Sequence, residues 1–422
     1  MASTDRIIEL SSLIAKETAV INDFLVQNQL PTPSLDAHAL KSIPIPEDAN
    51  EIHAARSAVI EACSELKALM TGPKELLKFD VVNIRIQWTA FVSVKAVLRF
   101  QLDKSFPVGE STTFEAMSEF SGLSVRNVRR IVRHAIINHY FFQEAQPGII
   151  THSGLTAALA EDEAVRNSLI VELDEFWPAG VKMADALEKW PNSEENNETG
   201  FSLANNSNKS MYEILAESPV RRERFGRYFA NPDKTADGIF DNYPWAEKAS
   251  MVDVGGSFGS VAIGIAQRFP NIKCVVQDLP DTIAEAEPRL PAELRGRVTF
   301  MPYDFFTIQP VHADVYFFRS IFHNWADKYC IQILQNLVPA LKPGARVVIH
   351  ERILPGLEGL NTADARRAIN LDIGMQQLLN AQQRERHEWP ELFRKADPRF
   401  RYIGAEKPVG AMRWIIEAEW EG

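Results

Sequence analysis

The sequence predicts a two-domain α/β protein in which a mostly helical N-terminal domain precedes a Rossmann-like domain with a mainly parallel sheet. A chain of 422 residues is too long for one hydrophobic core. Helical periodicity dominates as far as residue 245, and short apolar strands alternate with helices from residue 250 onward. The composition, 45% hydrophobic and 24% charged, is typical of a soluble globular protein, and no apolar run is long enough to span a membrane.

Three helices are expected first, at 5–28, 51–70 and 82–101, because apolar residues recur there at helical spacing. Four prolines within residues 30–50 separate the first helix from the second.

The segment 112–155 predicts a winged-helix unit. A short helix ends at Gly122, a second helix follows the N-cap candidate Ser124, and two apolar runs then flank a Pro-Gly turn. The second helix carries four arginines, Arg126, Arg129, Arg130 and Arg133. They fit either a DNA-binding regulator or a structural module whose arginines are solvated or paired with acids. The net charge of −11 favours the structural module and no nucleic-acid partner, because a nucleic-acid interface requires clustered positive charge.

Residues 165–245 are expected to be mainly helical, with a polar loop at 192–210. Aromatic and methionine side chains at helical spacing are more often core residues than ligand contacts. Four of them are nevertheless selected as substrate-pocket candidates: Phe176, Trp177, Met183 and, farther along the chain, Met375.

The segment after residue 250 contains five candidate strands, "SMVDVG", "IKCVVQDL", "RVTFMPY", "DVYFFRS" and "ARVVIHERI". Strands that alternate with helices form parallel sheets, and such sheets bind ligands at the carboxyl ends of their strands.

The glycine-rich turn after the first of these strands, "VDVGGSFG", does not match the common nucleotide motifs. A dinucleotide fingerprint starting at Gly255 would need glycines where Ser257 and Ser260 stand, and no Lys-Ser or Lys-Thr follows as in a P-loop. The remaining pattern, Asp253 followed by Gly255, Gly256 and Gly259, is that of the first motif of class I methyltransferases, with Ser257 in place of the usual middle glycine.

Three acids at successive strand ends suit S-adenosylmethionine as the cofactor. Asp253 could receive its ammonium group, and Asp278, 23 residues after Gly255, could accept both ribose hydroxyls beside Leu279. Asp304 could accept the adenine amino group while Phe305 lies against the ring. One such acid alone is more often a turn residue, so the signal lies in the set of three.

The sequence resembles plant-type O-methyltransferases of the fungal branch from about residue 82 to the C-terminus. The resemblance is carried by "VDVGGSFG", "VVQDLP", "YDFF", "FRSIFHNWADKYCIQILQNLVPALKPGARVVIHERILP" and "RERHEW". It implies a class I methyltransferase domain at 161–422 with a seven-stranded sheet and a helical substrate-binding insertion at about 165–245. It also implies a winged-helix dimerisation domain at 1–160, a homodimer, and transfer of methyl from S-adenosylmethionine to a hydroxyl of a small aromatic or polyketide-type secondary metabolite.

The same resemblance assigns site residues. His323 in "FHNWAD" falls on the catalytic base, Glu351 and Glu385 fall on the two acids that flank it, and Arg319 replaces the commoner lysine near the cofactor. The chemistry agrees, because an imidazole can take a hydroxyl proton near neutral pH and a carboxylate on its other nitrogen would fix the tautomer.

Several alternatives stay open. A histidine just before a helix can be a cap or core residue, Ser257 departs from the family's turn, and "ERHEW" is shorter than the family's spacing, which weakens the assignment of Glu385. Some fungal relatives keep the scaffold and the cofactor but catalyse dehydration or pericyclic reactions, usually with a cation in place of the histidine. Retention of His323 favours methyl transfer.

No metal site is expected, because neither "HERIL" nor "HEWPE" contains the second histidine of an HExxH motif. The three cysteines are widely spaced and no signal peptide is recognised, so a cytoplasmic protein with reduced thiols is expected.

Overall fold

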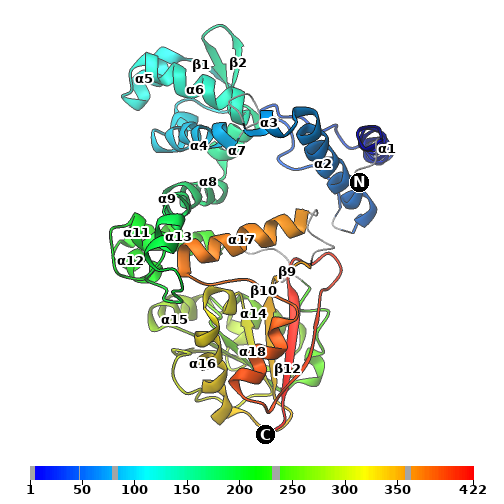
Figure 1. Ribbon diagram of the computed structural model, residues 1–422, viewed down its shortest axis with the longest axis vertical. Coiled ribbons are helices and arrows are strands. Elements are labelled where there is room, and N and C mark those ends of the chain that lie inside the picture. Colours follow the sequence, from blue (N-terminus) through cyan, green and yellow to red (C-terminus); the bar gives the residue numbers. More distant parts are fainter. Residues whose placement is uncertain (1–4, 47, 78–83, 231–237, 357–362) are drawn as a thin grey trace. The chain divides into compact units, whose positions relative to one another are not determined.

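The computed structural model describes residues 5–46, 48–77, 84–230, 238–356 and 363–422. The chain forms two compact units, Met1–Glu175 and Phe176–Gly422 (Figure 1). The division of the chain into functional domains at residue 160 stays a prediction.

Helices make up most of the first unit. They begin with α1 (Arg6–Gln27), α2 (Asn50–Thr71), α3 (Pro73–Leu77) and α4 (Ile84–Arg99), which places the three expected helices within a few residues of their expected ends. Residues 82 and 83 of the third expected helix lie outside the described residues. The Arg6 guanidinium of α1 donates to both Glu65 carboxylate oxygens of α2, at 2.8 and 2.7 Å.

The expected succession of two helices and a hairpin is present in the first unit. It comprises β1 (Ser111–Thr113), α5 (Phe114–Ser121), α6 (Val125–His139), β2 (Gln143–Gln146) and β3 (Ile149–Thr151), with the strands antiparallel in the order β1-β3-β2. Gly122 ends α5 with a φ of +73°, a left-handed conformation that glycine adopts without strain. The Ser124 hydroxyl accepts the Asn127 backbone N–H, as an N-cap does. The helices α7 (Gly154–Glu161) and α8 (Glu163–Val171) complete the unit.

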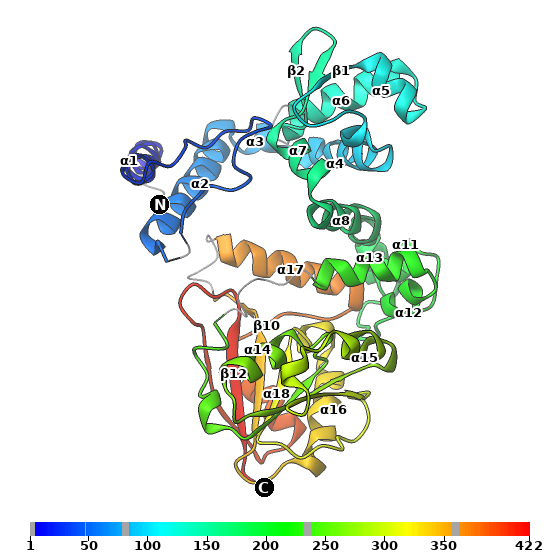
Figure 2. The same cartoon turned by 180° about the vertical axis from the view of Figure 1, so that it is seen from behind.

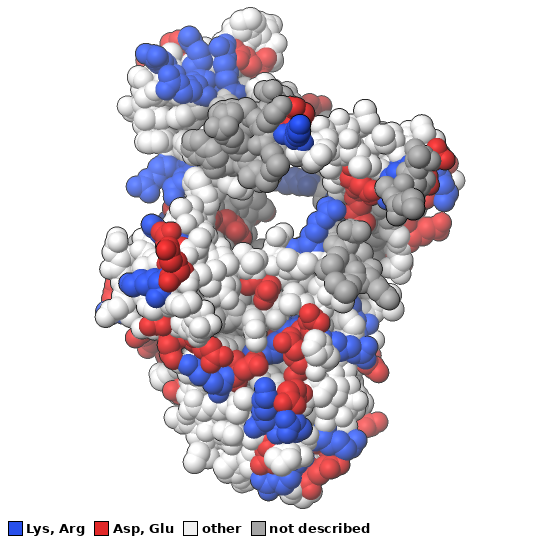
Figure 3. All heavy atoms as spheres, viewed as in Figure 1, with Lys and Arg blue, Asp and Glu red and all other residues white. Residues whose placement is uncertain are grey.

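Two of the four arginines of α6, Arg129 and Arg133, lie next to acidic side chains. Arg133 donates to both carboxylate oxygens of Glu144 on β2, at 2.8 and 2.7 Å, and Arg129 lies 3.8 Å from Glu115 of α5. In the face drawn in Figure 3, basic side chains gather in this part of the first unit with acidic side chains at their margin. Such pairing reduces the positive potential that a nucleic-acid interface needs and favours the structural interpretation.

The second unit begins with short helices: α9 (Trp177–Val181), α10 (Met183–Lys189), α11 (Gly200–Ala204), α12 (Met211–Ala216) and α13 (Pro219–Ala230). The polar loop expected at 192–210 is interrupted by α11, so only its first part, 192–199, is the loop that separates α10 from α11. Its residue Glu195 accepts from Lys328 and Tyr329, both at 2.6 Å, and the Asn380 amide donates to the Ser193 carbonyl at 2.8 Å. The loop is thereby attached to two other helices of the unit.

A seven-stranded sheet forms the centre of the second unit, in the order β11-β12-β8-β7-β4-β5-β6. Its first five strands along the chain are those expected, β4 (Ser250–Val254), β5 (Lys273–Asp278), β6 (Val298–Pro302), β7 (Val315–Arg319) and β8 (Arg346–Glu351), and they pair in parallel. The last two, β11 (Phe400–Glu406) and β12 (Trp414–Trp420), were not located individually from the sequence. β12 is antiparallel to both of its neighbours, so the sheet is mainly parallel, as expected.

Helices cover both faces of this sheet. α16 (Asp327–Leu337) and α18 (Glu388–Ala396) lie in front of it in Figure 1, and α14 (Ser260–Arg268) lies in front of it in the reverse view of Figure 2. Residues alternate along the strands accordingly. In β7, Tyr316 and Phe318 pack with α16 and α18, whereas Val315 and Phe317 belong to the core beneath α14. α15 (Pro280–Ala286) follows β5, and α17 (Ala363–Leu379) packs against the short strand β9 (Ile353–Leu354) beyond β8.

The strand order reverses between β4 and β7, which are neighbours although they are not consecutive in the sequence. At such a switch point the loops that follow the two strands diverge and leave a crevice for a ligand at the carboxyl ends. The glycine turn follows β4, and the segment that contains His323 follows β7. Within the described residues, no helix combines the length and the hydropathy needed to cross a membrane.

Candidate active site

The glycine turn after β4 passes so close to neighbouring groups that it has no room for side chains at two positions. A Cβ atom on Gly255, whose φ is +71°, would lie 2.5 Å from Ile321 Cδ1. A Cβ atom on Gly256 would lie 2.7 Å from Asp253 Cγ and 2.9 Å from Val276 Cγ1. The turn therefore presents bare backbone at the crevice, as close approach of a cofactor requires.

Ser257 stands in this turn with a φ of +51°, in the left-handed region that glycine adopts more readily. Its backbone N–H donates to Asp278 Oδ2 at 2.9 Å, and the Leu279 N–H donates to Oδ1 of the same carboxylate at 2.8 Å. The serine is thus accommodated in the motif conformation, and Asp278 connects the turn to the end of β5.

Two of the three expected cofactor acids are accessible and one is buried. Asp278 is half-buried and Asp304 is exposed, whereas Asp253 is only 2% exposed and lies behind Gly256. Burial raises the pKa of Asp253 to about 7, and the positive charge of Arg319 opposes this shift. Asp278 and Asp304 could accept hydrogen bonds from a ligand at the surface of the crevice. The glycine turn lies between the crevice and Asp253, so a ligand would have to pass the turn to contact that side chain.

Aromatic rings surround the end of β6 next to Asp304. The rings of Phe305 and Phe306 have centroids 5.0 Å apart, and Trp325 lies 5.9 and 4.7 Å from them. The Phe306 N–H donates to Asp304 Oδ1 at 2.9 Å. Flat rings beside an exposed carboxylate suit a planar heterocycle that carries an amino group, which fits the adenine of S-adenosylmethionine.

His323 lies in a single 3₁₀ turn, Phe322–Asn324, between β7 and α16. Its Nδ1 atom is 2.8 Å from the side-chain nitrogen of Gln383. Gln383 is 3% exposed, and its backbone N–H donates to Asp372 Oδ1 of α17 at 2.7 Å. Neither Gln383 nor Asp372 was selected from the sequence, and no motif or spacing marks them.

The surroundings of His323 favour the neutral ring. Burial lowers the pKa of His323 to about 3, and the positive charges of Arg413, Arg384 and Arg352 add to the effect. An imidazole in this setting is uncharged at neutral pH, and its cation is poorly stabilised. The Gln383 amide nitrogen occupies Nδ1, so the proton of the neutral ring is on Nε2.

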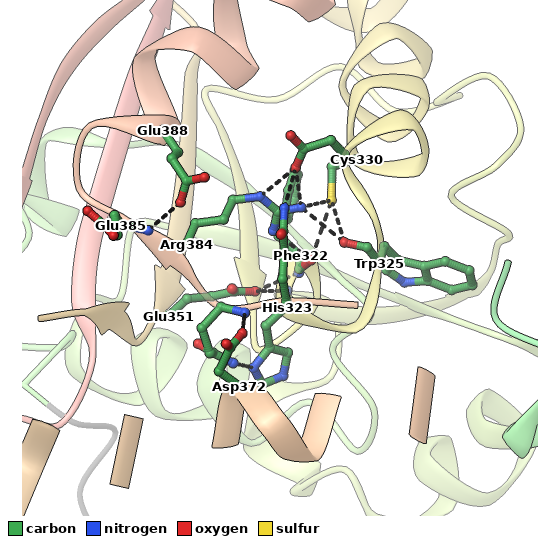
Figure 4. A network of polar contacts seen from close by, with 12 residues as sticks. Phe322, His323, Trp325, Cys330, Glu351, Asp372, Arg384, Glu385 and Glu388 are labelled. Carbon is green, nitrogen blue, oxygen red and sulfur yellow. Dashed lines mark hydrogen bonds and ion pairs between the residues drawn. The ribbon is translucent and has the colours of Figure 1, made fainter. Parts of the chain in front are cut away.

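Glu351, at the end of β8, contacts the backbone of the His323 turn and not the imidazole. Its Oε1 accepts the backbone N–H groups of Phe322 at 2.5 Å and His323 at 3.2 Å (Figure 4). The side chain is 1% exposed, and burial raises the pKa of its carboxyl to about 7 against the opposing charge of Arg384. Glu351 therefore orients the segment that carries His323.

Glu385 is not brought to His323 in this structure. It is exposed, its carboxylate lies 3.2 Å from His387 Nδ1, and its backbone N–H donates to Glu388. Figure 4 shows it beside Glu388 and away from the His323 ring. Its role as a flanking acid stays a prediction.

Arg384 fixes the His323 turn to α16. The guanidinium is 1% exposed and donates to the carbonyls of Phe322 and Trp325, both at 3.0 Å, and to Asp327 Oδ1 at 3.0 and 2.8 Å. It also lies 3.2 Å from Cys330 Sγ (Figure 4). Sequence reasoning did not identify this residue either, because its partners come from a segment more than fifty residues away.

The four substrate-pocket candidates lie in the second unit and differ in their surroundings. Phe176 contacts Tyr228 edge to face, with centroids 5.5 Å apart, and Trp177 is half-buried in α9. Met183 lines a small cavity with Trp190 and Asn380, and Met375 of α17 is 7% exposed. Their contact with a substrate stays a prediction. Among the residues that the structure describes, no group of three or more His, Cys, Asp or Glu side chains could hold a metal ion.

Comparisons with known proteins place this site in a family. A family profile described as an O-methyltransferase domain matches residues 186–398. The Grayanic acid biosynthesis cluster O-methyltransferase of Cladonia grayi is 36% identical over 98% of this chain and 88% of its own length. The chain belongs to the O-methyltransferase family. S-adenosylmethionine is its cofactor, and the bare turn, the accessible acids and the aromatic rings fit that molecule.

Two solved structures share the fold. The crystal structure of OxaC in complex with SAH and oxaline has a TM-score of 0.76 at 21% identity and covers 99% of this chain and 100% of that chain. A structure described as a pericyclic reaction enzyme has a TM-score of 0.71 at 22% identity and covers 87% of this chain and 94% of that chain. At these identities the comparison shows a common fold, which hosts different reactions.

Proposed function

We propose that this O-methyltransferase methylates a hydroxyl group of a small aromatic or polyketide-type secondary metabolite, with His323 as the proton acceptor. The carrying observation is the position of His323 after β7, at the switch point where Gly255 and Gly256 expose backbone to a cofactor. The relative named for a grayanic acid biosynthesis cluster supports a role in secondary metabolism.

In the proposed reaction the hydroxyl proton moves to Nε2 of the neutral His323 ring, and the freed electron pair on oxygen forms the new bond to carbon. This step requires the ring proton on Nδ1, with the Gln383 amide turned so that its oxygen accepts that proton in place of the amide nitrogen now 2.8 Å away. When bound, S-adenosylmethionine supplies the methyl group as a sulfonium and leaves as the neutral thioether S-adenosylhomocysteine. Glu351 holds the backbone of the His323 turn, Arg319 lies near the buried Asp253, and Asp278, Leu279, Asp304 and Phe305 hold the nucleoside.

The test starts with labelled S-adenosylmethionine and a panel of phenols and polyketides. A product heavier by one methylene and dependent on the cofactor is expected. His323→Ala should lower turnover by roughly 10²–10⁴-fold and leave the affinity for S-adenosylhomocysteine, measured by calorimetry, nearly unchanged. Unchanged turnover in this variant would remove His323 from the mechanism.

A pericyclic or dehydration reaction is the alternative function. It is favoured by one observation: the Nδ1 atom of His323 faces a neutral amide, so the described contacts provide no carboxylate on the ring to stabilise its cation. The shared fold with a pericyclic reaction enzyme is compatible with it. A product isomeric with the substrate, or lighter by one water, would establish this alternative over methyl transfer.

We also propose that the chain is a cytoplasmic homodimer that assembles through its winged-helix domain. Large apolar side chains are exposed on α1 and α4, among them Ile8 at 67%, Phe91 at 44% and Val92 at 48%. Exposed apolar faces of this kind are typical of subunit interfaces. Light scattering at micromolar concentration should give about twice the chain mass of 47.5 kDa, and a monomer mass at every concentration would contradict the proposal.

A further inference from the structure

The contact at Nδ1 of His323 is made by Gln383, a residue with no assigned role. Gln383 Nε2 lies 2.8 Å from His323 Nδ1, and the backbone N–H of Gln383 donates a hydrogen bond to Asp372. The Oε1 atom of Gln383 is buried and has no hydrogen-bond partner among the described groups. Among the described groups, His323 is therefore the contact of the Gln383 side-chain amide, and Asp372 is the contact of its backbone N–H.

The ionisable and polar groups that influence His323 come from several segments. The ring itself is influenced by Arg352 after β8, Arg384 of β10 (Arg384–Glu385), Arg413 before β12 and the backbone of Ser320. Glu351 at the end of β8 and Asp372 of α17 act through the His323 backbone and Gln383. The carboxylate of Glu351 is engaged with backbone N–H groups, and that of Asp372 accepts from the Gln383 backbone. The contact to Nδ1 itself is made by an amide.

The observed amide contact on Nδ1 differs from a carboxylate in two respects. Both fix the ring orientation, but the amide N–H donates to Nδ1 and places the ring proton on Nε2, whereas a carboxylate would accept from Nδ1–H and leave Nε2 free. Only a carboxylate also stabilises the imidazolium, since it carries a full negative charge. An amide leaves the cation without that support.

We propose that Gln383 is the positioning residue that fixes the tautomer of His323 and keeps its ring neutral. This inference rests on the proposed function only in treating His323 as the group that exchanges a proton with the substrate. In the tautomer that the Gln383 nitrogen fixes, Nε2 carries the proton, so the ring accepts a substrate proton only after the amide turns its oxygen toward Nδ1. It then does so readily only from an acidic hydroxyl, such as a phenol or an enol, because the cation formed has no carboxylate partner at Nδ1.

The test follows the His323 ring nitrogens by NMR in the full-length protein labelled with ¹⁵N-histidine, with the signal assigned through its loss in His323→Asn. In the native chain one neutral tautomer is expected throughout pH 5–8. Gln383→Leu removes the contact and should give averaged shifts of two tautomers. Gln383→Glu places a carboxylate on Nδ1 and should raise the pKa of His323 by about 1–3 units.

Gln335→Glu serves as the matched control. Gln335 lies in α16 and donates to the Ala396 carbonyl, so the same change of charge there should leave the His323 titration where it is. Binding of S-adenosylhomocysteine, measured by calorimetry, shows which variants are folded. If Gln383→Glu does not fold, Gln383→Leu still tests the tautomer.

Two results would overturn the inference. One is identical ¹⁵N shifts of the His323 ring in the native chain and in Gln383→Leu, and the other is an unchanged pKa of His323 in folded Gln383→Glu. Its failure is distinguishable from failure of the proposed function. A chain that transfers no methyl group to any substrate but shows the expected tautomer and titration changes would refute the function alone.

Discussion

Replacement of Glu351 by Gln should make the stability of the protein less sensitive to alkaline pH than that of the native chain. The carboxyl of Glu351 is buried, and burial raises its pKa from 4.5 to about 7. Between these values the folded protein binds a proton that the unfolded chain has already lost. The contribution of the raised pKa to stability is therefore fully present below pH 4.5 and is lost as the pH rises through 7.

The size of the effect follows from the same two values. From pH 5.5 to the folded-state pKa of about 7 is about 1.5 pH units, and each unit corresponds to about 1.4 kcal/mol. The free energy of unfolding of the native chain should therefore fall by about 2 kcal/mol between pH 5.5 and 8 through this group. Glutamine cannot ionise and keeps an oxygen that can accept the Phe322 and His323 N–H groups. The difference in free energy of unfolding, variant minus native, should therefore rise by about 2 kcal/mol over this range.

The assay is urea unfolding followed by tryptophan fluorescence at pH 5.5 and 8. All tryptophans except Trp88 lie in the second unit, so the signal reports mainly on the unit that contains Glu351. Glu385→Gln is the control, because that exposed side chain should change stability by less than about 0.5 kcal/mol at either pH. A difference between Glu351→Gln and native that is the same at both pH values would refute the reasoning.

Three further outcomes are expected from the site. Gly256→Ala should weaken S-adenosylhomocysteine binding in calorimetry by roughly tenfold or more, because the new methyl would collide with Asp253 and displace the turn, and native affinity would contradict the close approach. Asp278→Ala should cost about 1–3 kcal/mol of the same affinity through lost charge-assisted hydrogen bonds, whereas an unchanged dissociation constant would exclude it from the nucleoside site. Arg384→Met should lower the free energy of unfolding in urea by about 2–4 kcal/mol, since it removes the guanidinium's hydrogen bonds to the Phe322 carbonyl and to Asp327, and a loss below about 0.5 kcal/mol would show that the buried guanidinium adds little.

Much of the fold could be predicted because its signals are local in the sequence. The period of apolar residues located β4 to β8, and Gly122 and Ser124 marked where α5 ends and α6 begins. Strands β11 and β12 were not located individually, because they follow one another directly without the intervening helix that identified the others. The pairing of β12 with β8 depends on contacts between segments about seventy residues apart.

The site was predictable where it depends on backbone shape and less so where it depends on side-chain contacts. The turn at Gly255 and the acid Asp278 follow from spacing, and the structure brings them together. Glu351 was expected to contact the imidazole, but in the structure its carboxylate accepts the backbone N–H groups of Phe322 and His323. Gln383 carries no motif at all, since its neighbour His323 is sixty residues distant in the chain.

Two adjacent residues, Gln383 and Arg384, have different roles: one contacts the imidazole and the other holds the segment in place. Arg384 fixes the segment with hydrogen bonds to the His323 turn and α16, and Gln383 next to it supplies the group that faces the imidazole. Because the anchor is independent of the amide, residue 383 can change in evolution while the loop stays in place. A scaffold of this kind can acquire a different proton chemistry by a single substitution, without first losing its fold or its cofactor site.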